Sequence, residues 1–205
     1  MLEAINLGCV RGDRRLFTNL NLRLEPGGLV EVHGPNGSGK TSLLRILCGL
    51  AAPAEGEVRW KEEKIRSLGE EYSSEIAYLA HQNGVKDELS AVENLRLSSA
   101  LNGRPLTKDE TQTFLDRVGL GNCDGLPARV LSAGQRRRLA LARLLAADAS
   151  LWILDEVMAS LDSAAVALSR KFISDHLNAG GLAIVATHQE LELPVSGSQR
   201  IDLRS

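Results

Sequence analysis

The first part of the chain alternates between apolar and polar positions. Residues 1–7 alternate loosely, and residues 20–24 carry three leucines at every second position. This period of two is typical of strands with one buried face, so both segments are predicted as strands of an antiparallel sheet. The turn-forming sequence at 25–28 follows, and then a short apolar strand at 29–33.

Later in the chain, continuous apolar runs alternate with segments of helical periodicity. Further strands are predicted at residues 76–80, 151–154, 182–187 and 199–204, and helices at 41–49, 132–147 and 164–179. Buried strands that alternate with helices favour an α/β fold with a mostly parallel sheet covered by helices on both faces. The N-terminal antiparallel strands add a separate β part.

Three helix starts carry the capping-box pattern, a hydroxyl residue followed three positions later by Glu or Gln. They are Ser90, Thr107 and Ser132. These starts predict a helical subdomain over about residues 84–147, within a single domain that spans residues 1–205.

Composition excludes several classes of protein. The chain has 205 residues, of which 43% are hydrophobic and 24% charged, as in soluble globular proteins. Only 3% are aromatic and the net charge is −2, which argues against nucleic acid as a partner. No run approaches the ~20 apolar residues that cross a bilayer, and no secretory signal is expected at the start. The widely spaced Cys9, Cys48 and Cys123 are predicted to be reduced and buried.

A glycine-rich segment between a strand and a helix fits the phosphate-loop pattern G-x-x-x-x-G-K-[ST]. It consists of Gly34, Pro35, Asn36, Gly37, Ser38, Gly39, Lys40 and Thr41, with Ser42 next. Glycines let backbone N–H groups wrap a phosphate, and the helix start adds its positive dipole end. These residues are predicted to bind ATP, with Lys40 reaching the β and γ phosphates and Thr41 ligating Mg²⁺.

Two carboxylates follow the apolar strand at 151–154. Asp155 is predicted to hold Mg²⁺, and Glu156 to polarise the water that attacks the γ-phosphate. A carboxyl pair after a strand is often an ordinary turn. The phosphate loop in the same chain favours the catalytic interpretation.

Four more motifs make the pattern specific. Residues 131–135 resemble the LSGGQ signature of ABC ATPases, 160–162 resemble the D-loop of that family, and Gln82 and His188 match its Q-loop glutamine and switch histidine. The resemblance covers essentially the whole chain and implies a P-loop NTPase of ABC type. On this resemblance the chain is expected to be an enzyme that hydrolyses ATP to ADP and phosphate.

The resemblance also implies roles for these residues. Glu156 is the general base, His188 steadies the γ-phosphate and the water, and Gln82 senses or holds Mg²⁺ together with Asp155. Two copies form a head-to-tail homodimer, so that one copy's signature closes on the other's ATP. The residues concerned are Ser132, Ala133, Gly134 and Gln135 of the signature and Asp162 of the D-loop.

Segments 80–95, 131–144, 151–156 and 186–189 look most like the ATP-binding subunits of the heme exporter of bacterial cytochrome c maturation. This resemblance implies a peripheral subunit on the cytoplasmic side of the inner membrane, held by integral membrane subunits. Its ATP hydrolysis would power heme export or the release of a periplasmic heme chaperone. The segment after Gln82, with Val85, Leu89 and Leu97, is the expected docking surface, although these residues could equally fill the helical core.

Some positions depart from the family pattern. Arg11 stands where relatives stack an aromatic residue on adenine, and it is either a stacking guanidinium or a solvated loop charge. Ala133 replaces a signature glycine, and Val157 replaces a proline. His33 and His81 are expected to serve local structure.

Two further expectations concern surface charge. His176 is predicted to lie on a helix surface, and residues 136–138, three consecutive arginines, are predicted to form a solvated face.

Three alternative functions stay open. The chain could power a transporter for another substrate, or it could be a soluble ABC ATPase that acts on nucleic acid or ribosomes. The single phosphate loop and the short insertion between Gln82 and Leu131 argue against the soluble class. A non-hydrolysing scaffold is disfavoured because the catalytic residues are all present.

Overall fold

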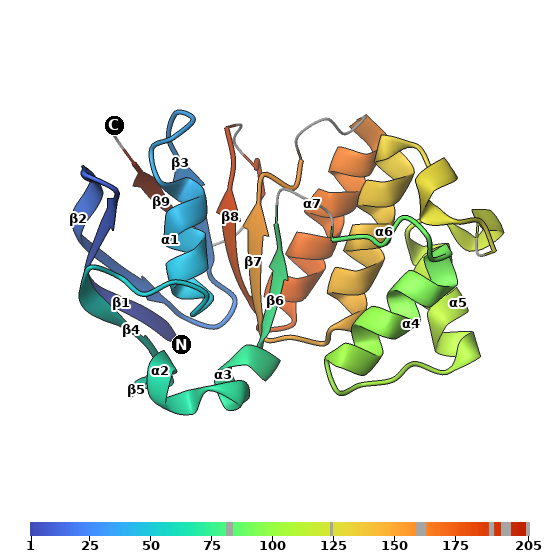
Figure 1. The fold of residues 1–205 in the computed structure, drawn as a ribbon, viewed down its shortest axis with the longest axis horizontal. Helices are drawn as coiled ribbons and strands as arrows, with labels where there is room; N and C mark the ends of the chain where they lie inside the picture. The colour runs from blue at the N-terminus through green and yellow to red at the C-terminus, as the bar shows by residue number, and fades with distance from the viewer. Residues whose placement is uncertain (81–83, 124, 159–162, 189–190, 194–197, 204–205) are drawn as a thin grey trace. The chain divides into compact units, whose positions relative to one another are not determined.

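The computed structural model describes residues 1–80, 84–123, 125–158, 163–188, 191–193 and 198–203 (Figure 1). The chain divides into two compact units. The first comprises Met1–Tyr78, Ala149–Val157 and Phe172–Ser205, and the second Leu79–Asp148 and Met158–Lys171. Each unit is described by itself.

The first unit contains an antiparallel sheet with the strand order β2-β1-β4-β5. Its strands are β1 (Leu2–Arg11), β2 (Arg14–Leu24), β4 (Glu55–Trp60) and β5 (Glu63–Lys64). The two predicted N-terminal strands are confirmed, and both are longer than their alternating cores. The predictions missed β4 and β5, whose charged residues hide the strand pattern.

The same unit contains a second sheet with the order β6-β7-β8-β3-β9. Its strands are β3 (Leu29–His33), β6 (Ile76–Leu79), β7 (Leu151–Asp155), β8 (Leu182–Ala186) and β9 (Gln199–Asp202). The pairs β7–β8, β8–β3 and β3–β9 are parallel, which confirms the predicted mostly parallel sheet. Asp155 pairs with Ala186, and Ala186 with Val32. The carboxyl ends of three central strands therefore lie side by side.

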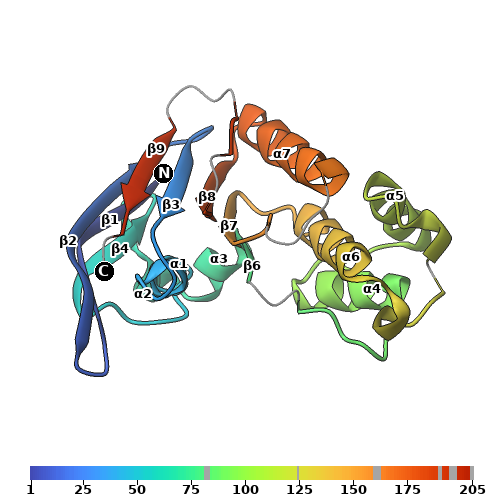
Figure 2. The same ribbon diagram turned by 90° about the horizontal axis from the view of Figure 1, so that it is seen from above.

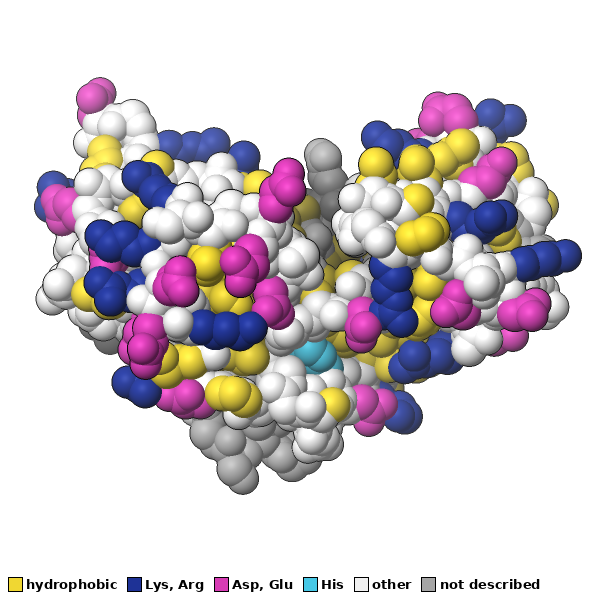
Figure 3. All heavy atoms as spheres, turned by 90° about the horizontal axis from the view of Figure 1, so that it is seen from below, with side chains coloured by type: hydrophobic (Ala, Val, Ile, Leu, Met, Phe, Trp, Pro, Cys, Tyr) yellow, Lys and Arg dark blue, Asp and Glu magenta, His cyan; other side chains and the backbone are white. Residues whose placement is uncertain are grey.

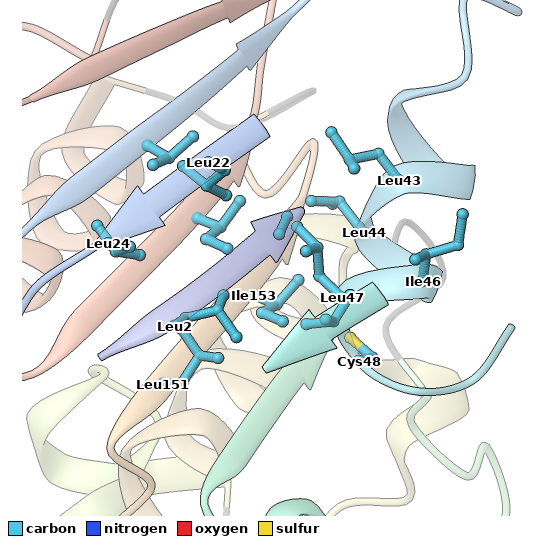
Figure 4. Packing of buried hydrophobic residues seen from close by; sticks show 14 of the residues in the cluster. Leu2, Leu22, Leu24, Leu43, Leu44, Ile46, Leu47, Cys48, Leu151 and Ile153 are labelled. Carbon is cyan, nitrogen blue, oxygen red and sulfur yellow. The ribbon is translucent and has the colours of Figure 1, made fainter. Parts of the chain in front are cut away.

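Helix α1 (Lys40–Leu47) lies between these two sheets in both ribbon views (Figures 1 and 2). Figure 4 shows its apolar side chains among those of β1, β2 and β7. The labelled core residues are Leu2, Leu22, Leu24, Leu43, Leu44, Ile46, Leu47, Cys48, Leu151 and Ile153. Full burial of one leucine side chain contributes roughly 1.5–3 kcal/mol, so this packing fixes the start of α1 against the ends of the strands.

Two short helices and the C-terminal part of a long helix complete the first unit. The helices α2 (Ile65–Leu68) and α3 (Glu70–Ser74) were not predicted, whereas α7 (Ser163–Asn178) matches its predicted range. The C-terminal part of α7 belongs to the first unit and its N-terminal part to the second.

The prediction that His176 lies on a helix surface is only partly right, because the residue is half-buried. Its ring stacks on Trp152 with 4.0 Å between ring centroids and 6° between planes, and its Nε2 lies 3.1 Å from the Leu182 carbonyl oxygen. Burial lowers the pKa of His176. Aromatic packing outweighs the imidazole's affinity for water here.

The second unit contains the helices α4 (Ala91–Leu101), α5 (Lys108–Arg117) and α6 (Ala133–Ala146), with two short 3₁₀ turns, η1 (Gly121–Cys123) and η2 (Ala128–Val130). Ser90, Thr107 and Ser132 cap α4, α5 and α6, and each forms a complete capping box. All three predicted helix starts are confirmed. Such a cap contributes about 1 kcal/mol because it satisfies amides that the helix itself cannot pair.

The expectation of a solvated face at residues 136–138 is wrong for Arg137, which is only 5% exposed. Its Nη1 lies 3.5 Å from the Ala80 carbonyl oxygen. Three consecutive helical positions point in different directions, so one of them turned inward.

Surface charges are mixed where Figure 3 shows them. Lys and Arg side chains lie among Asp and Glu side chains there, without a large area of one sign. In the part of the chain that the structure describes, no helix has the length and apolar content needed to cross a membrane.

Candidate active site

The loop between β3 and α1 has a backbone that requires glycine. Gly34 has φ 149°, Gly37 φ 80° and Gly39 φ 106°, and Gly39 is the N-cap of α1. A Cβ built on Gly34 would lie 2.5 Å from both the Ser38 hydroxyl oxygen and the Leu203 carbonyl oxygen. Gly34 therefore leaves no room for a side chain, and a glycine backbone of this kind can wrap closely around a phosphate.

The Lys40 ammonium group lies inside this loop. Its Nζ donates to the carbonyl oxygens of Gly34 at 2.9 Å and Pro35 at 3.3 Å. Nζ also lies 3.4 Å from Glu156 Oε1, and the Lys40 side chain is 5% exposed. A buried ammonium group needs such partners, and here the loop carbonyls and the carboxylate after β7 supply them.

The Glu156 carboxylate and the His188 ring face each other beyond the ends of β7 and β8. His188 Nε2 lies 2.9 Å from Glu156 Oε1 and 3.4 Å from Lys40 Nζ. The ammonium group can only donate and the carboxylate can only accept. The shorter contact therefore assigns the proton to His188 Nε2, which donates to Glu156.

Glu156 adopts a backbone conformation that is rare for residues other than glycine. Its φ is 53°, and its N–H donates to the Ala186 carbonyl oxygen at 3.0 Å. Left-handed backbone at such a residue costs roughly 1–2 kcal/mol and marks a functional constraint where it persists. Here it turns the carboxylate off the end of β7 toward Lys40. Val157, which follows, is buried at 1% exposure.

A second contact joins the start of α1 to the end of β7. Thr41 Oγ1 donates to Asp155 Oδ2 at 2.8 Å, and Asp155 is 2% exposed. Hydroxyl and carboxylate oxygens are the hard donors that Mg²⁺ prefers, so the pair fits the role predicted for it. Among the described residues, no cluster of three or more His, Cys, Asp or Glu side chains could hold a metal. A Mg²⁺ ion at this pair would take most of its ligands from water and phosphate.

One polar atom in the loop has nothing to bond to. Ser38 Oγ is buried and makes no hydrogen bond, while the Ser38 N–H donates to the Pro35 carbonyl oxygen at 3.2 Å. A buried hydroxyl without a partner costs about 1–3 kcal/mol. Such a cost is maintained where a bound group supplies the missing partner, and a phosphate oxygen in the cradle would do so.

Burial and nearby charges shift the pKa values of two side chains in the first unit. Burial, together with the charge of Asp155, raises the pKa of Tyr78 to about 12. Burial raises the pKa of the Cys9 thiol, while a hydrogen bond with Ser42 and the charge of Arg11 act in the opposite direction. Arg11 thus lies at the exposed end of β1, within electrostatic range of a thiol that contacts Ser42. Cys9 and Cys48 are free and buried, as predicted, but Cys123 is only half-buried.

Sequence reasoning missed the function of one pair on β3. His33 Nε2 lies 3.1 Å from Glu31 Oε2, and the Leu191 N–H donates to the same oxygen at 3.4 Å. The pair thereby anchors the chain shortly after His188. Two ionisable residues at alternate positions of a buried strand were the available signal, and only His33 was noted, as local structure.

The signature residues lie in the second unit. Ser132 is the N-cap of α6: its Oγ accepts from the Gln135 N–H at 3.2 Å, and Gln135 Oε1 accepts from the Ser132 N–H at 2.8 Å. Ser132 and Ala133 are exposed. The first N–H groups of a helix have no partner within it, so those of Ala133 and Gly134 are the ones that could donate to an anion. Gln82, Asp162 and His81 lie outside the described residues.

The first unit thus brings together two groups of predicted site residues. Lys40, Glu156 and His188 form one cluster, and Thr41 with Asp155 forms the other. Together they offer an anion cradle, a cation inside it, a carboxylate beside the cation and a pair of oxygen ligands. This arrangement can bind a nucleotide phosphate and activate a water against it.

Comparison with known proteins gives consistent matches. The family described as ABC transporter matches residues 17–159. The chain is 55% identical over 202 residues to a protein of Nitrosospira multiformis named cytochrome c biogenesis ATP-binding export protein CcmA, covering 98% of each. It is also similar to a solved ABC transporter ATP-binding protein from Pyrococcus furiosus, with TM-score 0.84, 26% identity and coverage of 97% and 96%. Another match, with TM-score 0.78, 26% identity and coverage of 92% and 88%, is a dimeric ATP-binding cassette bound to ADP and phosphate.

Stability without nucleotide should distinguish the two hydroxyls of the loop. We expect Ser38→Ala to leave the free energy of unfolding unchanged or to raise it, because no hydrogen bond is lost. Thr41→Val should lower it by about 1–3 kcal/mol, because Asp155 loses a donor. Urea denaturation of both variants measures the difference. An equal loss in the two variants would show that Ser38 Oγ has a partner after all.

Proposed function

The chain belongs to the ABC transporter family, and from that premise we propose that it is the ATP-hydrolysing subunit of a membrane complex in cytochrome c biogenesis. The observation that supports the biogenesis role is 55% identity to a named export ATPase over 98% of both chains. The contacts between Lys40, Glu156 and His188 support the hydrolytic activity.

Capture of ATP begins with the Lys40 ammonium group. In the structure it is shared between the loop carbonyls and Glu156. A phosphate in the cradle would offer Lys40 a stronger, charged acceptor, and the Ser38 hydroxyl would gain a partner. Once Lys40 turns toward the phosphates, the Glu156 carboxylate is free to accept a proton from water. Arg11, at the exposed end of β1, would contribute a stacking guanidinium for the base.

Mg²⁺ accompanies ATP in this proposal. The ion would be held by Thr41 and Asp155, with Gln82 as a further ligand, and it would neutralise charge on the β and γ phosphates. Glu156 orients the attacking water and takes its proton. His188, which contacts Glu156 in the structure, would steady the γ-phosphate when ATP is bound.

The working unit is a head-to-tail homodimer. Exposed Ser132 and Ala133, with Gly134 and Gln135, would contact the γ-phosphate that Lys40 of another copy binds. The D-loop residue Asp162 would complete the contact between copies. The dimeric cassette bound to ADP and phosphate, at TM-score 0.78, supports this arrangement.

The partners are integral membrane subunits that hold the chain on the cytoplasmic side of the bacterial inner membrane. A shallow depression of about 510 Å³ in the second unit supports docking on α4. Leu89, Val92, Leu97 and Leu106 line it, and Leu97 is 41% exposed. The transported group is heme, and the work of hydrolysis reaches a periplasmic heme chaperone through the membrane subunits.

Substitutions at Glu156 and Lys40 test the hydrolytic site. Glu156→Gln should keep ATP binding but lower turnover by roughly 10²-fold or more, because an amide cannot accept the proton. Lys40→Ala should instead weaken binding of the γ-phosphate and reduce activity. Phosphate release and nucleotide binding by the purified variants measure both effects. Hydrolysis at the wild-type rate by either variant would remove that residue from its role.

Mixing two inactive variants tests the shared site. In a head-to-tail dimer, Lys40→Ala and Ser132→Arg damage opposite halves of each site. An equimolar mixture should therefore recover roughly a quarter of wild-type activity, since about half of the dimers would contain one intact site. Each variant alone is the control. No recovery, in a mixture shown to exchange subunits, would contradict the head-to-tail arrangement.

A gentle membrane pulldown tests the biogenesis role. The tagged chain, expressed in its native host, should retain membrane proteins together with heme, detected by its absorbance band and by mass spectrometry. Loss of heme from the complex on adding ATP, but not with Glu156→Gln, is expected. Membrane partners carrying another ligand would favour the alternative of a transporter for a different substrate. Ribosomal or nucleic-acid partners would favour the soluble alternative.

A further inference from the structure

The loop at residues 84–90, directly after the Gln82 segment, is bonded to the chain that leads into the signature. The Arg129 N–H donates to the Asp87 carbonyl oxygen at 2.9 Å, and the Ala128 N–H donates to the Leu89 carbonyl oxygen at 2.8 Å. Both residues belong to η2, which ends just before Leu131. The 84–90 loop therefore lies beside η2, the segment that precedes the signature.

One side chain connects them with all of its nitrogens. Arg136 Nη1 lies 3.1 Å from Asp87 Oδ1, Nε donates to the Leu131 carbonyl oxygen at 3.2 Å, and Nη2 donates to the Arg129 carbonyl oxygen at 2.8 Å. A planar guanidinium holds its donors in fixed directions, so the three partners are fixed relative to one another. Arg129 and Leu131 lie just before Ser132 in the chain, and Asp87 belongs to the 84–90 loop.

Side chains of two helices hold the 84–90 loop through several hydrogen bonds. The buried Asn94 side chain donates to the carbonyl oxygens of Lys86, Leu89 and Ser90 and accepts from the Lys86 N–H, at 2.7–3.0 Å. At the start of the loop, Arg143 Nη1 donates to the Gly84 carbonyl oxygen at 2.7 Å. These bonds restrain the loop, so we expect a displacement of one part of it to move the rest.

We propose that Arg136 is a positioning residue that orients the Ser132 helix start and links it to the 84–90 loop. A partner subunit that contacts this loop would then shift the signature through Arg136. The inference rests on the proposed ATPase function and goes beyond it by naming the connection. The Arg136–Asp87 pair is 34% and 53% exposed, and pairs of this kind add little to stability. Its loss should therefore change the position of the signature without unfolding the chain.

Kinetics of Arg136→Ala test the link. We expect kcat for ATP hydrolysis to fall roughly tenfold, because displacement of a transition-state group by a fraction of an ångström has effects of this size. The affinity of the monomer for a non-hydrolysable ATP analogue should change by less than about twofold, since the phosphate loop is untouched. Arg136→Lys should not rescue kcat, because a lysine cannot contact three partners in fixed directions. An unchanged kcat, or rescue by lysine, would overturn the proposal.

A double-substitution cycle tests the contact between Arg136 and Asp87 of the 84–90 loop. Asp87→Ala should lower kcat by a smaller factor, roughly threefold, and Asp87→Ala with Arg136→Ala should be no worse than Arg136→Ala alone. Effects that multiply would show that the two residues act independently, and would overturn the link. The matched control is Arg104→Ala, which breaks the exposed Arg104–Asp148 ion pair elsewhere in the same unit. It should leave kcat within about twofold of wild type.

Hydrogen exchange gives a readout that does not depend on catalysis. Without nucleotide, peptides covering 129–135 and 84–90 should exchange faster in Arg136→Ala, and both should also do so in Asp87→Ala. Arg104→Ala should change neither peptide. If wild-type protein shows no ATPase activity, the proposed function fails and the exchange result alone decides the inference. Faster exchange in only one of the two peptides would refute the link.

Discussion

The Lys40 ammonium group is the constraint on which the active site depends. It is almost fully buried, and a buried positive charge is tolerated only when oxygen atoms surround it. Two of those oxygens belong to the loop after β3 and one to Glu156 after β7, while His188 after β8 completes the cluster. One charge therefore holds the ends of three strands in contact. The tight glycine loop and the strained backbone of Glu156 both serve this arrangement.

Much of this could be predicted from the sequence because its signals are local. The glycines of the loop, the capping boxes at Ser90, Thr107 and Ser132 and the apolar runs of β7 and β8 each depend on a few neighbouring residues. Parallel strands place their carboxyl ends at one edge, so motifs distant in the chain were expected together. The contact between Thr41 and Asp155 follows from that rule.

The parts that escaped prediction depend on tertiary packing. Strands β4 and β5 have few apolar residues, and they form because a neighbouring strand offers backbone partners, β1 to β4 and β4 to β5. His176 and Arg137 are polar residues that turned inward because an aromatic ring and a carbonyl group lay within reach. The pair of Glu31 and His33 likewise depends on the approach of Leu191. A local sequence pattern cannot predict these contacts, since the partners come from distant parts of the chain.

The difference between local sequence signals and tertiary contacts also applies to Arg136. In the sequence it is one of three consecutive arginines, and a run of like charges usually indicates a solvated surface. In the fold its neighbours are two carbonyl groups on the way to Ser132 and one carboxylate of the 84–90 loop. In the proposed head-to-tail dimer the signature must be oriented before the second copy arrives, because a misdirected helix start would not reach the γ-phosphate bound by that copy. Within the second unit, the Ser132 cap sets the local geometry and Arg136 connects it to the surface where a partner would act.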